Sequence, residues 1–504
     1  MSPRLLAILL CLTLTGCATT RQPRAPESPR AVENTPRAPH PLAASLDALL
    51  HTTDAKNALW GVFVQSLDSG DTIYDYQGRR LMLPASAMKL LTLAAAAERL
   101  GWDFRYETEV LSAAPLVDGV LQGDLIVRGS GDPSIHTDSE TDTPVFDAWA
   151  TTLQEQGIRR IDGRVIGDDN RVEDPAPGYG WSWDDLPYGY AALTGALVHQ
   201  DNTVRLIVHS GSVAGEDTLV EVAPLASGVE IINRVETELA YTDAELTLHR
   251  QTDGTLEIRG GVPAGSSPVS RTAAVRNPTT FFVRSVKQSF EQRGIEVTGD
   301  AVDLDDVAGR LNEGSPRVLA RHESPPLSSL ATTLMQASHN LYAETLLNTL
   351  DQNRRPRTAD SGRAAVRDLL AAWGIDASEA VVADGSGLSR HNLVTAHALV
   401  EVLRRMHEQP RHAVAFLETL PVAGVSGTLA SRMVGTAAEG NVRAKTGSMA
   451  NVRTLAGYVT SADGEPLAFA ILANNFSGSP DPVLAVIDGL VDRLAQSDRS
   501  ESGR

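Results

Sequence analysis

The middle of the chain has a different residue pattern from the two parts that flank it. Residues from about 109 to 304 form short β-branched segments, such as 125–128 and 204–208, separated by Gly, Asp and Pro turns. Amphipathic patterns typical of helices return after about residue 305, over 327–350 and 358–373. The strand-like middle and the helical remainder indicate an α+β chain. Because 504 residues exceed the size at which one hydrophobic core keeps growing, we expect several domains. The β-rich insertion spans 109–304, with a second nested unit at about 205–270.

The first sixteen residues resemble a bacterial export signal. Arg4 precedes an apolar run, 5–15, that is too short to span a bilayer. The run ends in Leu-Thr-Gly-Cys17, which resembles a lipoprotein signal whose cysteine becomes the lipidated first residue. We therefore expect a periplasmic chain held to a membrane only through lipid on Cys17, and Ala18 favours the outer membrane. The alternative is an ordinary cleaved signal in which the cysteine is incidental.

Residues 17–42 and 494–504 are expected to be flexible. The first segment is rich in Pro, Arg and Ala with few bulky apolar residues, so burial cannot offset its ordering entropy. The only other cysteine, Cys11, lies in the signal, so the mature chain forms no internal disulfide. A formal charge of −19 argues against nucleic acid or anionic lipid as the main partner.

Ser86-Ala-Met-Lys89 stands at the start of a predicted helix. The segment 86–100 is rich in strong helix formers, with Pro84 before it and Gly101 after it. A serine hydroxyl is a poor nucleophile unless a base lies within hydrogen-bond reach, and side chains three residues apart share one helix face. Burial lowers the pKa of a lysine, so Lys89 is the candidate base for a nucleophilic Ser86.

Two further motifs follow in the second half of the chain. They are Ser338-His339-Asn340 and Lys445-Thr446-Gly447-Ser448, the latter just before strand-like runs at 455–460 and 467–473. A hairpin pattern at 60–76 opens the folded part. Ser-x-x-Lys, Ser-x-Asn and Lys-Thr-Gly in this order form the set seen in penicillin-binding proteins and serine β-lactamases.

Lysine usage supports these motifs. The chain has only four lysines among 44 basic residues, namely Lys56, Lys89, Lys287 and Lys445. Arginine is therefore the general cation, and a guanidinium cannot be deprotonated to act as a base. A bias toward arginine codons explains why lysine is scarce, but it does not explain why two of the four occupy the motifs.

Longer stretches resemble the low-molecular-mass class C penicillin-binding proteins, the D-Ala-D-Ala carboxypeptidase/endopeptidase family. The resemblance covers about 43–493 and is carried by the stretches 128–133, 181–185, 384–390, 420–429 and 442–448. It implies a transpeptidase-like (serine β-lactamase-like) domain, an antiparallel sheet flanked by helices, built from 43–108 and 305–493. It also implies that the insertion lies between the first and second motifs.

The same resemblance implies a role for each motif residue. Ser86 would attack the carbonyl of the penultimate D-alanine of a peptidoglycan stem peptide, or the ring carbonyl of a β-lactam. Lys89 would take the proton of the Ser86 hydroxyl. Ser338 with Asn340 would relay protons and orient the substrate, and Lys445 would complete the electrostatics. The expected substrate-binding residues are Thr446, Gly447 and Ser448 for the terminal carboxylate, and Asp185, Tyr190 and Arg390 for the side chain of meso-diaminopimelate. Alternatively, Asp185 and Arg390 are ordinary surface charges.

Other patterns predict no additional chemistry. His339 stands where Asn or Asp is commoner in the family, and we expect it to pack away from the nucleophile. Glu344 resembles a class A β-lactamase glutamate but lies too close to Ser-x-Asn, so we interpret it as structural. His407 and His412 are one residue too far apart for a zincin motif, and we expect no metal or cofactor.

Three functions fit the sequence. The first is a serine D,D-peptidase that cleaves D-Ala-D-Ala ends and D-Ala-meso-diaminopimelate crosslinks. The second is a β-lactamase or esterase with the same residues, which the large insertion disfavours. The third is a non-catalytic scaffold that binds peptidoglycan, which the intact motif set disfavours. No feature of the sequence identifies a protein partner.

Overall fold

The computed structural model describes residues 41–52, 57–137, 143–307 and 315–498. The chain divides after Pro39, and the second unit, His40–Arg504, contains all of these residues. The predicted export signal, Cys17, Ala18 and Lys56 lie outside the described residues. Within the described ranges, no helix is both long enough and apolar enough to cross a membrane.

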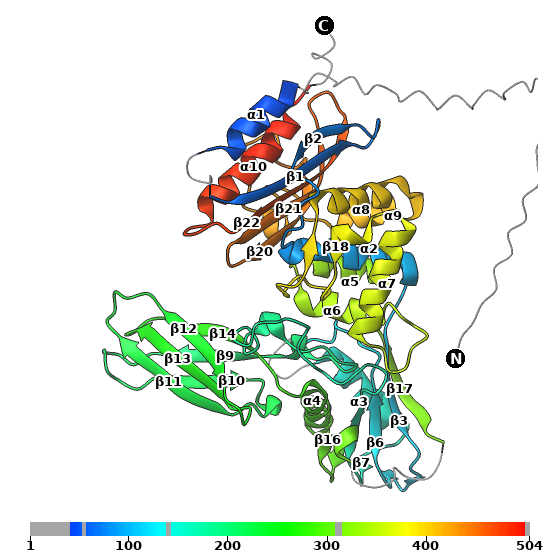
Figure 1. Cartoon of the computed structure of the whole chain (residues 1–504). Helices are drawn as coiled ribbons and strands as arrows, with labels where there is room; N and C mark the ends of the chain where they lie inside the picture. The colour runs from blue at the N-terminus through cyan, green and yellow to red at the C-terminus, as the bar shows by residue number, and fades with distance from the viewer. Residues whose placement is uncertain (1–40, 53–56, 138–142, 308–314, 499–504) are drawn as a thin grey trace, which may run out of the picture. The chain divides into compact units, whose positions relative to one another are not determined.

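A five-stranded antiparallel sheet joins the two ends of the folded chain (Figure 1). Its strand order places the N-terminal hairpin beside the last strand, because β1 pairs with β22 along its whole length. The predicted hairpin and closing strands are confirmed. In spatial order the strands are β2 Thr72–Tyr76, β1 Leu59–Ser66, β22 Pro466–Asn474, β21 Val452–Thr460 and β20 Arg443–Met449.

The strand β22 is apolar on both sides because it lies between two cores. Leu467, Phe469 and Ile471 belong to the core on one face, together with helices α1 Pro41–Leu50 and α10 Asp481–Ala495. Ala470 and Leu472 belong to the core on the other face, where α8 Ala396–Glu408 packs. Since successive side chains of a strand point to opposite faces, a continuous apolar run is what a central strand covered on both sides requires.

A group of helices on the second face carries the predicted buried helix. The 3-10 turn η2 Ala85–Met88 leads directly into α2 Lys89–Leu100, whose side chains are buried from Lys89 to Ala97. Four consecutive alanines, 94–97, let the neighbouring helices approach closely. The helices around α2 are α5 Leu327–Gln336, α6 Asn340–Thr349, α7 Ala359–Ala372, α8 and α9 Pro410–Thr419.

The prediction of one helix over 327–350 is wrong. The chain forms two helices there, α5 and α6, and Ser338 between them has a left-handed backbone with φ 58°. A residue with a side chain rarely adopts this conformation and cannot continue an α-helix. The apolar period survives the break because both helices bury their faces in the same core.

The insertion is built on a mixed sheet that extends beyond the predicted boundary. Strand β17, Arg317–Glu323, pairs antiparallel with β3, Glu107–Ser112, at the edge of this sheet. A boundary that follows strand pairing therefore lies after Glu323 and not at 304/305. The residue pattern of a strand does not reveal which sheet the strand joins. The other strands are β6 Leu125–Arg128, β8 Val165–Asp168 and β16 Ala301–Asp303, and a smaller sheet has β4 Leu116–Val117, β5 Val120–Leu121, β7 Arg160–Ile161 and β15 Glu296–Val297.

Helices α3 Pro144–Glu155 and α4 Pro278–Gln292 pack with these sheets in a separate core. Between α3 and α4 the chain forms a nested unit of two three-stranded sheets with its own core, over 203–274. Its strands are β9 Thr203–His209, β10 Leu219–Ala223 and β14 Val269–Ala274 in one sheet, and β11 Ile231–Glu238, β12 Glu245–Arg250 and β13 Leu256–Pro263 in the other.

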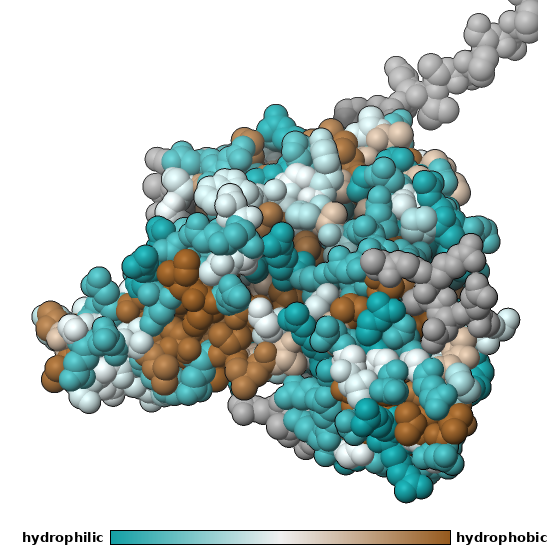
Figure 2. All heavy atoms as spheres, turned by 90° about the horizontal axis from the view of Figure 1, so that it is seen from below, coloured by the Kyte–Doolittle hydropathy of each residue, from teal (hydrophilic) through white to brown (hydrophobic). Residues whose placement is uncertain are grey.

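The nested unit exposes several large apolar side chains, including Leu219, Leu225 and Tyr241. Figure 2 shows brown, hydrophobic surface gathered over this unit on the face seen there. Two remaining short strands, β18 Ala380–Val381 and β19 Leu393–Val394, pair with each other beside α8 and frame the loop between them.

Candidate active site

Ser86 and Lys89 meet at the junction of η2 and α2. Ala85, with φ 45°, turns the chain sharply just before the serine. Lys89 is the first residue of α2 and its side chain is fully buried. Its Nζ lies 2.9 Å from Ser86 Oγ. The sequence therefore places the two side chains in hydrogen-bond contact, as the three-residue spacing predicts.

The amine of Lys89 has two further partners. It donates to Asn340 Oδ1 and to the carbonyl oxygen of Ser386, each at 2.7 Å. Burial lowers the pKa of Lys89 to about 7, although the carboxylates of Asp384 and Glu344 act in the opposite direction. Near neutral pH a large fraction of Lys89 is therefore uncharged and able to accept a proton.

Lys445 holds Ser338 in a similar way. Its Nζ donates to Ser338 Oγ at 2.8 Å and to the carbonyl oxygen of Thr446 at 2.9 Å. Lys445 is also fully buried, and burial together with the positive charge of Lys89 holds its pKa well below the ordinary range. Two hydroxyls and two buried amines thus come together from η2, the start of α2, the α5–α6 break and β20.

Asn340 links this cluster to the insertion. As the first residue of α6, it accepts from Lys89 through its amide oxygen and donates through Nδ2 to the carbonyl oxygen of Tyr190 at 2.8 Å. Tyr190 lies in the short turn η3, Gly189–Ala191. A backbone group of the insertion therefore fixes which way the amide of Asn340 faces.

Gly447 lets β20 approach the nucleophile turn. A Cβ at this position would lie 2.1 Å from Thr454 Oγ1 and 2.6 Å from the carbonyl oxygen of Pro84. Thr454 Oγ1 itself donates to that same carbonyl at 2.8 Å. Thr446 donates to the hydroxyl of Thr428 at 2.7 Å, and Ser448 is exposed. Only glycine fits the middle position of this motif.

The loop after β18 supplies groups that the sequence reasoning did not assign. The carboxylate of Asp384 accepts from the backbone N–H of Gly387 and Ser389 and from Trp181 Nε1. Asn392 donates to the same carboxylate at 2.6 Å. This network gives the loop the shape that aims the Ser386 carbonyl at Lys89. The signal was the Asp-Gly-Ser-Gly stretch, which the family resemblance included without roles.

Glu344 anchors that loop from α6. Its buried carboxylate accepts from the backbone N–H of Gly385 and Ser386, the shortest contact being 2.7 Å. Burial and the nearby Asp384 raise the pKa of Glu344 to about 7. These contacts are with the backbone of the loop that binds Lys89, which agrees with a structural interpretation of Glu344.

His339 faces the insertion. Its Nε2 lies 3.2 Å from the carboxylate of Asp201, and its ring packs 4.7 Å from the ring of Tyr342. Asp201 lies in η4, Gln200–Asn202. The role of His339 stays a prediction, but these contacts are those of a packed residue between two parts of the chain.

The predicted diaminopimelate-binding residues come together only in part. Tyr190 donates its hydroxyl to Asp185 at 2.6 Å, and its ring stacks on Tyr188. Burial and Asp185 raise the pKa of Tyr190. Arg390 is exposed and donates to the carbonyl oxygen of Ala450 at 3.3 Å. No ion pair joins Arg390 to Asp185 in the described structure.

The geometry agrees with comparisons to known proteins. A family model described as the D-Ala-D-Ala carboxypeptidase 3 (S13) family matches residues 42–497. The chain belongs to the S13 family. The assignment of individual residues within this S13 chain stays a prediction that rests on the geometry above.

Relatives of this S13 chain are similar over most of its length. The D-alanyl-D-alanine carboxypeptidase of Actinomadura sp. strain R39 is 36% identical over 468 residues, which cover 90% of this chain and 84% of the relative. The crystal structure of penicillin binding protein 4 (dacB) from Haemophilus influenzae superposes with a TM-score of 0.80 at 27% identity, covering 90% of this chain and 99% of that one.

A second crystal structure of the Haemophilus influenzae protein holds a β-lactam and superposes with a TM-score of 0.73 at 26% identity, covering 90% of this chain and all of that one. The predicted family and the predicted α+β, penicillin-binding fold are confirmed.

Proposed function

We propose that this S13 chain is a serine D,D-peptidase that forms an acyl-enzyme on Ser86. The observation that carries the proposal is the environment of Lys89, whose amine lies 2.9 Å from Ser86 Oγ. Within the described part of the chain, no carboxylate is bonded to this amine. The amide oxygen of Asn340 and the carbonyl oxygen of Ser386 accept hydrogen bonds from two of its N–H groups. A neutral amine with two N–H groups so engaged directs its lone pair at the Ser86 hydroxyl, which is the arrangement a general base needs.

Acylation follows from this geometry. The Ser86 hydroxyl gives its proton to Lys89 as Oγ attacks the carbonyl carbon of the penultimate D-alanine. The backbone N–H groups of Ser86 and Ser448 stabilise the oxyanion. As the peptide bond breaks, the leaving amine of the terminal D-alanine takes the proton that Lys89 accepted. The hydroxyl of Ser338, which Lys445 contacts, relays this proton, so Lys89 is neutral again. The products are an ester on Ser86 and free D-alanine.

Water completes the cycle. It attacks the ester carbonyl as Lys89 accepts its proton, and the bond to Ser86 Oγ breaks as Lys89 returns that proton to Oγ. Thr446 and Ser448 bind the terminal carboxylate of the substrate through their hydroxyls. A β-lactam enters the same site because its ring amide and carboxylate match those of the D-Ala-D-Ala end.

We also propose that the chain cleaves crosslinks, using Asp185, Tyr190 and Arg390 to bind the free end of meso-diaminopimelate. That end carries an ammonium and a carboxylate, so one carboxylate and one guanidinium match it. The pairing of Tyr190 with Asp185 supports one half of such a pocket. Arg390, which is exposed on a loop facing Ala450, would turn toward the ligand carboxylate.

Export and lipidation remain part of the proposal. The chain would be a periplasmic lipoprotein, attached through Cys17 to the outer membrane and reaching peptidoglycan through its linker. Expressing wild-type and Cys17→Ser chains in a bacterium and separating the membranes tests this directly. Wild-type chain found only in the inner membrane would contradict the outer-membrane assignment, and equal membrane retention of both would contradict the lipid anchor.

Labelling with a fluorescent penicillin tests the catalytic proposal. Wild-type chain should acquire a label that decays slowly, and Ser86→Ala with unchanged melting temperature should acquire none. Release of D-alanine from a stem pentapeptide and cleavage of a crosslinked muropeptide would then be measured. Rapid loss of the label would favour a β-lactamase. Absence of label on folded wild-type chain would favour a non-catalytic scaffold.

A further inference from the structure

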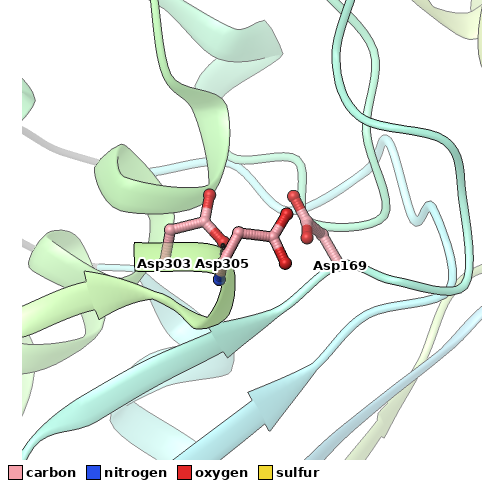
Figure 3. Close-up of side chains that lie close together, drawn as sticks. All are labelled: Asp169, Asp303 and Asp305. Atoms are coloured by element: carbon pink, nitrogen blue, oxygen red, sulfur yellow. Dashed lines mark hydrogen bonds between the residues drawn. The ribbon is translucent and has the colours of Figure 1, made fainter. Parts of the chain in front are cut away.

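Three aspartates meet at the carboxyl ends of two paired parallel strands in the insertion. Asp169 directly follows β8, Asp303 is the last residue of β16, and Asp305 lies in the turn η6, Leu304–Asp306. One carboxylate oxygen from each lies within 4.8 Å of the others. Figure 3 shows the carboxylate of Asp169 pointing toward those of the other two.

Asp169 is the buried member of this group. It is only 3% exposed, and its Oδ1 is a buried oxygen without a hydrogen-bond partner. The other oxygen accepts from the hydroxyl of Thr279 near the start of α4. Leaving a carboxylate oxygen both buried and unpaired is costly. Burial, with added repulsion from Asp303 and Asp305, raises the pKa of Asp169 to about 6.

In the part of the chain that the structure describes, these carboxylates have no cationic partner. Among the described residues, no lysine, arginine or histidine forms an ion pair with Asp169, Asp303 or Asp305. Within the group, the backbone N–H of Asp305 donates a hydrogen bond to Asp303 Oδ1 at 3.3 Å. Near neutral pH three negative charges therefore share a small space with only neutral donors around them.

We propose that Asp169, Asp303 and Asp305 bind a divalent cation, Ca²⁺ in preference to Mg²⁺. The donor set consists only of oxygens, which hard cations select. Oxygens that ligate one Ca²⁺ at about 2.3–2.6 Å lie no more than about 5 Å apart, which the 4.8 Å limit satisfies. Asp305 is exposed, so an ion can enter and keep water ligands.

The bound cation would join four elements of the insertion. Asp169 ties it to β8 and, through Thr279, to α4, while Asp303 and Asp305 tie it to β16 and η6. We therefore expect Ca²⁺ to stabilise the insertion without entering the chemistry at Ser86. Sequence reasoning missed this group because the three aspartates have no ligand-motif spacing and only strand pairing brings residues 169 and 303 together.

Calorimetric titration of the chelator-treated full chain with CaCl₂ tests the proposal. Wild type should bind one Ca²⁺ with a dissociation constant at or below about 1 mM, the range of extracellular calcium modules. Asp305→Asn should weaken binding by about tenfold or more because one anionic ligand is lost. Asp306→Asn is the matched control, since Asp306 is the neighbouring exposed aspartate outside the group, and its affinity should stay within about twofold of wild type.

Melting temperatures separate cation binding from a structural role of the aspartates. In EDTA, Asp305→Asn should melt at or above the wild-type temperature, because it removes repulsion. CaCl₂ should raise its melting temperature less than it raises that of wild type. The proposal is overturned if wild type gives no saturable binding up to about 10 mM CaCl₂. It is equally overturned if Asp305→Asn binds Ca²⁺ as wild type does.

Discussion

Lys89 and Glu344 bind opposite ends of the same residue, Ser386. Lys89 donates to its carbonyl oxygen and Glu344 accepts from its N–H, each at 2.7 Å. Both side chains are buried, and each has a pKa of about 7. The candidate base is therefore coupled to a carboxyl group on α6 through one short backbone segment, and this coupling governs how the site responds to pH.

Acylation by penicillin should depend on the neutral form of Lys89. Its rate should rise about tenfold per pH unit below 7 and level off above, because burial lowers the pKa of Lys89 to about 7. Stopped-flow acylation from pH 5 to 8 measures this. Lys89→Arg should lose at least about a thousandfold in rate at every pH, since a guanidinium stays protonated. A flat wild-type profile would contradict the role of Lys89 as base.

The same lysine should make stability depend on pH. The pKa of Lys89 is lower in the folded chain than in the unfolded one, so the unfolded chain binds more protons between pH 7 and 10. Stability therefore rises with pH in that window, by about 2 kcal/mol from pH 7 to 9 for this one group. Urea unfolding at both pH values should show a gain about 2 kcal/mol larger in wild type than in Lys89→Met, which keeps only the contribution of the buried Lys445. Equal gains in both chains would refute the assignment.

Glu344→Gln should shift the acylation profile to lower pH. The glutamate raises the pKa of Lys89, so its neutralisation removes a stabiliser of the ammonium form. The amide oxygen can still accept from Gly385 and Ser386, so the loop should keep its shape. Glu98→Gln, a change at a partly exposed glutamate of α2 that bonds His412, is the control and should leave the profile in place. An unshifted profile in Glu344→Gln would refute the coupling.

Gly447→Ala should abolish most acylation. The added methyl would lie 2.1 Å from Thr454 Oγ1 and 2.6 Å from the Pro84 carbonyl, so β20 must move away from the turn that holds Ser86. We expect a loss of about a hundredfold or more in acylation rate. Gly489→Ala in α10 is the control, because its nearest neighbour is 3.6 Å away and alanine favours helix by up to about 1 kcal/mol. Normal labelling of Gly447→Ala would contradict the close approach.

Asp185→Asn should impair cleavage of substrates with a free diaminopimelate end more than cleavage of those that lack it. A lost charge-assisted hydrogen bond corresponds to about tenfold to a hundredfold in kcat/KM. Asp118→Asn is the control, because Asp118 is an exposed aspartate of the insertion between β4 and β5. The effect is measured by the kinetics of cleavage of two stem peptides, one with and one without the free diaminopimelate end. Equal losses on both peptides would indicate a structural role for Asp185.

Local patterns predicted the elements that a short segment determines by itself. Residues 89–100 are strong helix formers and were predicted as a helix. The three-residue spacing then places Ser86 and Lys89 on one turn, because helix geometry depends only on neighbours along the chain. The hairpin pattern at 60–76 and the strand-like runs at 455–460 and 467–473 predicted β1, β2, β21 and β22. The break at Ser338 was missed because its left-handed backbone is imposed by the surrounding contacts and not by residue type.

The sequence by itself determined the three motifs, the family to which they belong and the contact between Ser86 and Lys89. Only the tertiary structure decided that the Ser386 carbonyl and Asn340 hold Lys89, that Glu344 anchors the Ser386 loop, and that β17 belongs to the sheet of the insertion. It also brought Asp169 to Asp303 and Asp305. The physical reason is that every residue has a backbone carbonyl, and the sequence does not show which charged side chains become buried. Long-range packing determines the partners of both.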